Sequence, residues 1–336
     1  NATLTAPQPL DATITTSTSS SGHAIACHGA TGSINLNITG GNQPWAISWN
    51  GPNGFTASTA NITDLLAGTY TASITDANGC SASEQVTLTE PDPLIATGVV
   101  GDFNGTGLSC ADASDGSIDL TVSGGAGGNT FIWASDNGFG ATAEDVSGLE
   151  PGNYTVVATD QNGCSTTASF QLAAPSVMNT SITVQDFNGS GVSCAGASDG
   201  GLALTIAGGT APHAVLWNGP NGFTGTGNAL SALAAGSYTA TITDANGCPA
   251  AANITLTAPD TLALRLTTTV FGGGNGVSCA GGNDGAIDLS ILGGTAPYNV
   301  AWSDGEGFTA TTTAITGLNA GVYQAIVTDI NGCSQQ

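Results

Sequence analysis

The sequence predicts an all-β protein, built as a tandem array of four immunoglobulin-like antiparallel β-sandwich repeats of about 84 residues, with one disulfide each. Apolar residues alternate with polar ones in several short segments, which is typical of half-buried strands. The 50 glycines and the frequent Thr and Ser disfavour helix. One six-residue motif occurs four times: TDANGC at 75–80 and 243–248, TDQNGC at 159–164 and TDINGC at 328–333.

Proline positions set the length of the repeat. Pro7, Pro91, Pro175 and Pro259 follow one another at intervals of 84 residues, and the chain of 336 residues is four such intervals long. The predicted organisation is a final strand of a preceding repeat at 1–7, repeats at 8–91, 92–175 and 176–259, and a fourth repeat at 260–336 that lacks its final strand.

In each repeat the first cysteine is followed by a strand in which apolar residues alternate, such as Ile34, Leu36 and Ile38. A Gly pair and a tryptophan follow, and then a Gly-Phe and a Gly-x-Tyr segment with its own alternation. We expect six to eight strands in each repeat. The tryptophan stands in an alternating strand, which favours a position in the core, as in immunoglobulin domains.

The TDxNGC motif predicts a tight hairpin turn before the last strand of each repeat. Asn-Gly is the strongest two-residue hairpin signal because both residues tolerate positive φ. The aspartate two positions earlier is expected to cap the turn through its side chain, and a calcium ligand is the alternative. These aspartates are Asp76, Asp160, Asp244 and Asp329.

Eight cysteines form four matched pairs, separated by 53 or 54 residues, which predicts one disulfide within each repeat. The pairs are Cys27 with Cys80, Cys110 with Cys164, Cys194 with Cys248, and Cys279 with Cys333. The alternative joins the second cysteine of one repeat to the first of the next. A loop of this size stabilises a domain by about 4 kcal/mol in the chain-entropy model. Persistent disulfides imply an oxidising compartment, and the absence of Cys-x-x-Cys disfavours zinc.

The charge balance excludes two classes of partner. The net charge is −23, from 24 acidic residues against the single base Arg265. Such a chain repels nucleic acid and anionic membrane surfaces, so we expect neither nucleic-acid binding nor membrane insertion by this segment. Charged residues make up 7% of the chain, and the outward positions of the strands are mostly Thr, Ser and Asn.

The order of motifs resembles the SprB-type repeat. The resemblance rests on Cys followed by Asp-Gly and an alternating strand, then Gly-Gly, Pro-aromatic, Trp, Ala-Gly-x-Tyr and Thr-Asp-x-Asn-Gly-Cys. The first repeat departs from it with Thr31-Gly32, and the second lacks the proline in GGAGGNTFIW. Such repeats build very large cell-surface adhesins in gliding and related bacteria of the Bacteroidetes. The resemblance implies an extracellular, non-catalytic protein of adhesive or structural function on a bacterial cell surface.

We therefore expect a cell-surface stalk, fibre or filament and not an enzyme, because the repeated carboxylates and hydroxyls belong to the framework. His23 and His28, near Cys27, occur in one repeat only, and an exposed-loop role is favoured over a metal site there. The alternative function is a carbohydrate-binding, lectin-like module that recognises surface glycans. In that case Trp45 and Tyr298, interpreted as exposed, are the candidate sugar-stacking residues.

Two related loops, DFNGTG at 102–107 and DFNGSG at 186–191, are candidate calcium sites. Asp and Asn at alternate positions present oxygen atoms as a calcium loop does. The candidate ligands are Asp102, Asn104, Asp186 and Asn188. The alternative is an Asx-rich β-turn without metal, and no other cofactor is expected.

Eight Asn-x-Ser/Thr triplets predict possible glycosylation, which would help to keep a chain with few charges soluble. The asparagines are Asn1, Asn37, Asn61, Asn104, Asn153, Asn179, Asn188 and Asn253.

The first residues, NATLTAP, match NITLTAP at 253–259, the final strand of the third repeat. We expect residues 1–7 to form a β-strand that pairs with a copy of the fourth repeat. The expected partners are therefore further repeats of the same chain or neighbouring copies. Further repeats of the same chain would form a continuous covalent array, whereas neighbouring copies would donate strands between subunits. The continuous covalent array is favoured.

Overall fold

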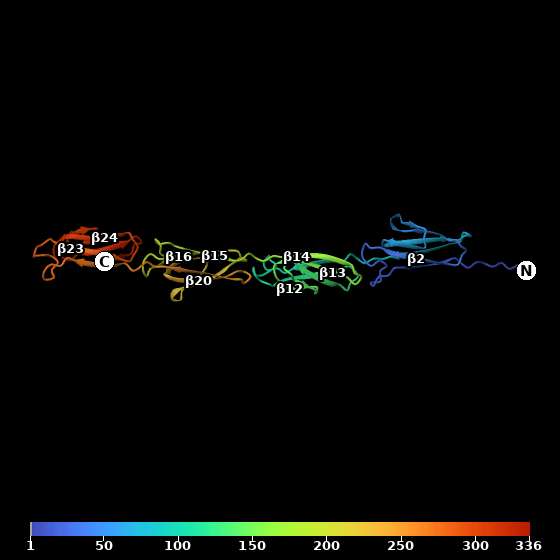
Figure 1. Ribbon diagram of the computed structural model, residues 1–336, viewed down its shortest axis with the longest axis horizontal. Coiled ribbons are helices and arrows are strands. Elements are labelled where there is room, and N and C mark those ends of the chain that lie inside the picture. Colours follow the sequence, from blue (N-terminus) through green and yellow to red (C-terminus); the bar gives the residue numbers. More distant parts are fainter. Residues whose placement is uncertain (1) are drawn as a thin grey trace. The chain divides into compact units, whose positions relative to one another are not determined.

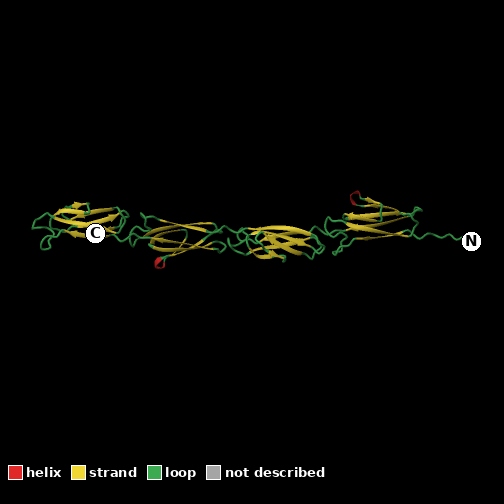
Figure 2. Ribbon diagram, viewed as in Figure 1, coloured by secondary structure: helices red, strands yellow, loops and turns green. Residues whose placement is uncertain are grey.

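The computed structural model describes residues 2–336 and confirms the all-β fold class. Strands account for nearly all regular structure, and Figure 2 shows two short 3-10 turns, η1 (Pro52–Gly54) and η2 (Pro220–Gly222). The chain divides into two compact units, 1–174 and 175–336. Each unit contains two β-sandwiches that follow one another along the chain (Figure 1).

Every repeat contains seven antiparallel strands, within the expected six to eight, arranged as a three-stranded sheet and a four-stranded sheet. In the first unit the sheets are β1 (Asp11–Thr16), β2 (Gly32–Thr39), β5 (Asn61–Leu65); β4 (Thr56–Ala57), β3 (Ala46–Asn50), β6 (Gly68–Thr75), β7 (Ser81–Leu88); β12 (Val146–Leu149), β9 (Gly116–Ser123), β8 (Ile95–Val100); and β11 (Gly140–Ala141), β10 (Thr130–Ser135), β13 (Gly152–Thr159), β14 (Ser165–Leu172).

The second unit repeats this arrangement. Its sheets are β15 (Asn179–Val184), β16 (Ser198–Ala207), β19 (Ala229–Ala234); β18 (Thr224–Thr226), β17 (Ala214–Asn218), β20 (Gly236–Thr243), β21 (Pro249–Leu256); β22 (Ala263–Thr268), β23 (Gly285–Leu292), β26 (Ala314–Leu318); and β25 (Thr309–Ala310), β24 (Tyr298–Ser303), β27 (Gln324–Asp329), β28 (Ser334–Gln335).

The predicted tryptophans form the centre of each core. Trp49, Trp133, Trp217 and Trp302 are all buried, which confirms the core interpretation. Each indole N–H donates to a backbone carbonyl ten residues later, as Trp49 does to Thr59 at 3.0 Å. Because a buried indole needs an acceptor for its N–H, this contact fixes the ring and ties the short edge strand to the core.

The Gly-x-Tyr segment supplies a second fixed ring. Tyr70 lies on β6, and its hydroxyl donates to the carbonyl of Leu66 at 3.0 Å, the tyrosine-corner arrangement of immunoglobulin-like domains. Phe55 packs edge-on against this ring, with centroids 5.4 Å apart and planes at 81°. The same contacts recur in the other three repeats.

The repeated Gly pair allows two backbone segments to touch. Gly40 has φ of 69°, and a Cβ added there would lie 1.9 Å from the carbonyl oxygen of Pro9. The chain entering the first repeat therefore crosses directly over the end of β2, and no residue with a side chain fits.

Residues 2–10 form no strand within the single chain, and Asn1 lies outside the described residues. The strand predicted for 1–7 pairs with a copy of the fourth repeat, so it stays a prediction. Leu4 is 99% exposed and does not pack into the core of the first repeat.

Candidate functional site at the junctions between successive repeats

The TDxNGC motif forms a capped turn in all four repeats, which confirms the predicted role of its aspartate. In the second repeat, one carboxylate oxygen of Asp160 accepts hydrogen bonds from the backbone N–H groups of Asn162 and Cys164, both at 2.9 Å. The other oxygen accepts from the N–H of Ala126 at 2.8 Å, directly after the Gly pair. The aspartate is buried and joins the turn to the Gly-pair loop at the same end of the sandwich.

These backbone donors favour the ionised carboxylate. At Asp76 the N–H groups of Asn42 and Cys80 hold the pKa below its ordinary value, against the smaller opposing effect of burial. At Asp244 burial acts to raise the pKa, but the N–H groups of Thr210, Cys248 and Asn246 together lower it. In these carboxylates one oxygen is occupied by the turn and the other by the Gly-pair loop, as a structural cap requires.

The predicted disulfide pairing within each repeat is wrong. Cys27 of the first repeat bonds to Cys164 of the second, and Cys194 of the third repeat bonds to Cys333 of the fourth. Cys110 and Cys248 are disulfide-bonded as well. Cys80 and Cys279 are free thiols, and both are exposed. The two bonds with known partners join the first cysteine of one repeat to the second cysteine of the next.

The length of the last strand explains this correction. Cys80 directly precedes β7, whereas the loop that holds Cys27 lies at the other end of β7, where the N–H of Ile25 donates to the carbonyl of Thr89 at 3.0 Å. Eight residues of strand span roughly 25 Å. A disulfide needs Cα atoms within about 7 Å, so Cys27 and Cys80 cannot bond without unfolding the repeat.

In the first unit, the junction joins the loop before β2 to the turn between β13 and β14. The Cα atoms of Cys27 and Cys164 are 5.7 Å apart. Beside this bond, the side-chain amide of Asn162 donates to the carbonyl of Ala26 at 2.8 Å and to the hydroxyl of Ser21 at 3.0 Å. Ser20 donates in turn to the amide oxygen of Asn162. The junction is therefore a covalent bond supported by a polar clamp.

The second unit repeats this geometry with different loop residues. The Cα atoms of Cys194 and Cys333 are again 5.7 Å apart. The amide of Asn331 lies 3.2 Å from the carbonyl oxygens of both Ser193 and Phe187, and Asn188 donates to its amide oxygen at 2.6 Å. The asparagine of TDxNGC thus binds the residue before the first cysteine in both junctions, a role that the hairpin interpretation missed.

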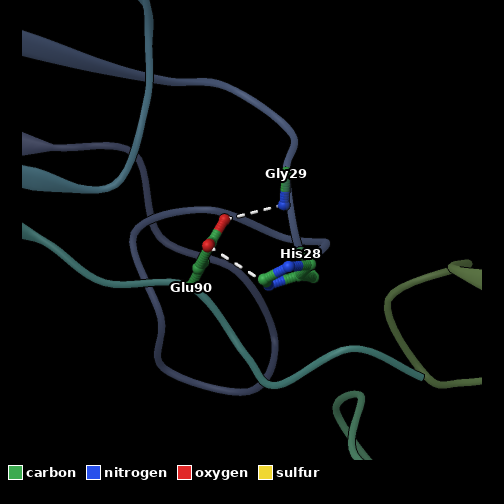
Figure 3. Close-up of polar contacts among 3 residues, drawn as sticks. All are labelled: His28, Gly29 and Glu90. Atoms are coloured by element: carbon green, nitrogen blue, oxygen red, sulfur yellow. Dashed lines mark hydrogen bonds and ion pairs between the residues drawn. The ribbon is translucent and has the colours of Figure 1, made fainter. Parts of the chain in front are cut away.

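A further contact fixes the segment that connects the first and second repeats. Glu90 follows β7, and its carboxylate accepts a hydrogen bond from the N–H of Gly29 at 2.7 Å. Its other oxygen lies 3.2 Å from Nδ1 of His28 (Figure 3). His23 contacts the hydroxyl of Thr89 in the same region, at 3.3 Å. Both histidines therefore hold the connection between repeats.

The candidate calcium loops are tight Asn-Gly turns. Phe103 pairs with Thr106 and Phe187 with Ser190, while Asn104 and Asn188 have φ of 54° and 51°. Asp102 accepts a hydrogen bond from the N–H of Gly105 at 2.7 Å, and Asp186 does the same with Gly189. One carboxylate oxygen of each aspartate thus caps its own turn.

The glycosylation candidates within the described residues are all exposed, as a modification would require. Some already make contacts: Asn188 belongs to the second junction, and the amide of Asn153 donates to Asp136 at 2.8 Å. Glycosylation stays a prediction.

The aromatic candidates for sugar stacking are less available than the sequence indicated. The four repeated tryptophans lie in the core. Trp45 and Tyr298 are half-buried, not exposed, and the Tyr298 hydroxyl donates to the carbonyl of Gly293 at 2.7 Å. Both side chains are therefore partly covered, and sugar stacking on them stays a prediction.

Residues 2–336 contain neither a cluster of metal-ligating side chains nor a membrane-spanning helix. No three His, Cys, Asp or Glu side chains gather there in a way that could hold an ion. No helix in this part of the chain has the length and apolar character to cross a bilayer.

Fold and junctions together define a tandem array of immunoglobulin-like repeats in which disulfides join successive repeats. The family model of the SprB repeat matches residues 104–138, in the second repeat, and residues 275–307, in the fourth. This finding confirms the resemblance seen in the motifs.

The solved structures that match this chain include tandem repeats of adhesion proteins. One is a tetra-tandem repeat in the extending region of a large adhesion protein, 16% identical, covering 96% of both chains with a TM-score of 0.29. Another is a Ca2+-stabilized adhesin that helps an Antarctic bacterium to reach out and bind ice, 18% identical, covering 96% of both chains with a TM-score of 0.35. A search of curated proteins finds no match.

Proposed function

We propose that these repeats form a tension-bearing stalk or filament of an adhesive protein on a bacterial cell surface, and that they catalyse no reaction. The SprB repeats support the adhesive class and an extracellular location. Disulfides between repeats support the same location, because such bonds persist in oxidising surroundings. The same geometry of the capping aspartates recurs in all four repeats, which supports a structural role for the TDxNGC motif.

One observation carries the proposal: the disulfides bridge very long stretches of chain. Cys27 and Cys164 are separated by 137 residues, and Cys194 and Cys333 by 139. A force that pulls on the two ends of the chain passes through these bonds. Residues 28–163 and 195–332 lie inside the closed loops and carry no load along their backbone.

This arrangement limits how far the chain can lengthen under load. A loop of 137 residues, if unfolded and pulled straight, would add up to about 490 Å. The disulfide prevents that release even when the enclosed strands separate. A surface stalk with these junctions keeps its length under drag, which suits a protein that holds a cell to a surface.

Single-molecule force spectroscopy tests the proposal. The oxidised chain, held by its two ends, is expected to release little contour length, because only residues 2–27, 164–194 and 333–336 carry load. After reduction, the enclosed repeats should unfold one after another with long extensions. The Cys164→Ser variant should release more contour length than the oxidised unmodified chain, without any reductant.

Cys80→Ser is the matched control, because Cys80 is a free, exposed thiol of the same motif. It should extend like the unmodified chain. Equal extension of the oxidised and reduced chains would contradict the proposed load path.

A further inference from the structure

The Asp-Gly pair of the third repeat holds the loop that carries the first cysteine. Asp199 lies at the start of β16, and one of its carboxylate oxygens accepts a hydrogen bond from the N–H of Ser193 at 3.1 Å. The hydroxyl of Ser193 donates to the same carboxylate. Because Ser193 directly precedes Cys194, these two hydrogen bonds fix the backbone at the cysteine.

Gly200, the second residue of the pair, allows the loop to lie this close to the strand. It is buried, and a Cβ added there would lie 2.8 Å from the carbonyl oxygen of Gly191 and 3.0 Å from that of Leu233. A side chain at this position would push the loop away from β16. With glycine, the loop packs on the strand that carries Asp199.

Ser193 also contacts both sulfur atoms of the junction disulfide. Its hydroxyl lies 3.5 Å from Sγ of Cys194, and its carbonyl oxygen lies 3.2 Å from Sγ of Cys333. The same carbonyl accepts a hydrogen bond from the amide of Asn331 at 3.2 Å. The residue that Asp199 holds therefore touches both halves of the bond and the clamp of the fourth repeat.

The first junction lacks this arrangement. Ala26 stands in the place of Ser193, and Thr31 stands in the place of the aspartate. Ser17 holds the loop instead: its hydroxyl donates to the carbonyl of Ala24 at 2.6 Å and accepts from the N–H of Ser33 at 3.1 Å. A neutral hydroxyl thus fixes the loop of the first junction, whereas a carboxylate, which forms stronger hydrogen bonds, fixes the loop of the second.

Asp199 carries its negative charge at neutral pH. The hydroxyl of Ser193, and to a smaller extent its N–H, hold the pKa of this carboxyl below its ordinary value. The aspartates of the two adjoining turns, Asp186 and Asp329, each accept hydrogen bonds within their own turns. Asp199 is therefore the carboxylate that acts on the loop of Cys194.

We propose that Asp199 is a positioning residue that lowers the reduction potential of the Cys194–Cys333 disulfide through Ser193. After reduction, the two hydrogen bonds to Ser193 keep the thiol of Cys194 beside that of Cys333. The effective concentration of one thiol at the other stays high, and the bond re-forms readily. This role does not depend on the proposed load path, because it concerns the redox equilibrium of one disulfide.

Glutathione provides the reference couple for this equilibrium. One glutathione thiolate attacks a sulfur of the disulfide, forms a mixed disulfide and frees one cysteine thiol. A second glutathione thiolate attacks the glutathione sulfur of the mixed disulfide, frees the other cysteine thiol and leaves oxidised glutathione. The protein disulfide is thereby reduced to two thiols, and two glutathione thiols are oxidised to one disulfide.

Asp199→Asn tests the role of the charge in the full chain. Asparagine keeps the size but forms weaker hydrogen bonds, so reduction of Cys194–Cys333 should become about tenfold more favourable, which is about 30 mV. Thiol alkylation across a series of glutathione redox buffers, followed by mass spectrometry, measures each disulfide separately. An aspartate that merely stabilised the repeat would affect its oxidised and reduced forms equally and would leave the potential unchanged.

Asp115→Asn is the matched control, because Asp115 makes the same contact with Ser109 in the second repeat, at 3.1 Å. It should leave the potential of Cys194–Cys333 unchanged. An unchanged potential in Asp199→Asn, or an equal shift in Asp115→Asn, would overturn the proposal.

Ser193→Ala tests whether Asp199 acts through this residue. It removes the hydroxyl and keeps the N–H, so it should make reduction about threefold more favourable on its own. Because both changes interrupt one route, the double variant should shift the potential by less than the sum of the two single shifts. Fully additive shifts would show that Asp199 acts by another route and would refute the proposed relay.

Discussion

Three residues of the TDxNGC motif have separate functions at the scale of single side chains. Asp160 caps the turn, Asn162 clamps the loop of the preceding repeat, and Cys164 forms the covalent bond. The sequence predicts the first function from local turn chemistry. The second depends on a contact with residues more than 130 positions away, which no local pattern reveals.

Asn162→Ala should make the Cys27–Cys164 disulfide easier to reduce. The variant loses hydrogen bonds to Ala26 and Ser21, each worth about 1 kcal/mol, which raises the reduction potential by about 20–60 mV. Titration in glutathione redox buffers measures this shift. Asn78→Ala is the control, because Asn78 is exposed in the first repeat and should leave the potential of this bond unchanged.

Asp76 should contribute a pH-dependent part of the stability of the first repeat. The N–H groups of Asn42 and Cys80 lower its pKa, so its contribution is present above about pH 4 and is lost as the pH falls through the lowered value. Urea unfolding of Asp76→Asn should show lower stability at neutral pH and a flatter decline in acid. Parallel pH profiles of the two proteins would contradict this assignment.

At the scale of elements, the sequence predicts the strands well because alternation and turn residues are local signals. The alternating residues Ile34, Leu36 and Ile38 lie on β2, and the Asn-Gly turns stand where the motif places them. The sequence does not predict at which end of the sandwich each cysteine lies. That position depends on how many strands the chain forms between two cysteines, and the matched spacing of the cysteines does not reveal this number.

The Gly pair gives a prediction about how the chain enters each sandwich. Gly293→Ala should destabilise the fourth repeat by about 2–5 kcal/mol, because φ is positive there and the new Cβ would lie 2.2 Å from the carbonyl oxygen of Thr261. Gly272→Ala in the same repeat meets no atom within 4 Å and should change the stability by less than about 1 kcal/mol. Chemical denaturation of both variants makes the comparison.

The Asn-Gly turns of the candidate calcium loops give a second prediction at this scale. Asp102 and Asp186 each use one oxygen to cap their own turn, so added calcium should leave the melting temperature unchanged. A rise of several degrees on calcium addition, reversed by a chelator, would show that these loops bind the ion after all. Asp186→Asn would then abolish the part of that rise due to its loop.

At the scale of the whole molecule, covalent bonds between repeats change what the array does. A disulfide within a repeat would stabilise that repeat alone. The two bonds join cysteines 137 and 139 residues apart, and they link the first repeat to the second and the third repeat to the fourth.

Disulfide mapping tests this central claim most directly. The oxidised chain, with free thiols blocked before non-reducing proteolysis, is cut with a protease that does not need basic residues, because Arg265 is the single Lys or Arg of the sequence. Mass spectrometry should find peptides of Cys27 joined to Cys164 and of Cys194 joined to Cys333, with the blocking group on Cys80 and Cys279. Peptides that join Cys27 to Cys80 would contradict the account.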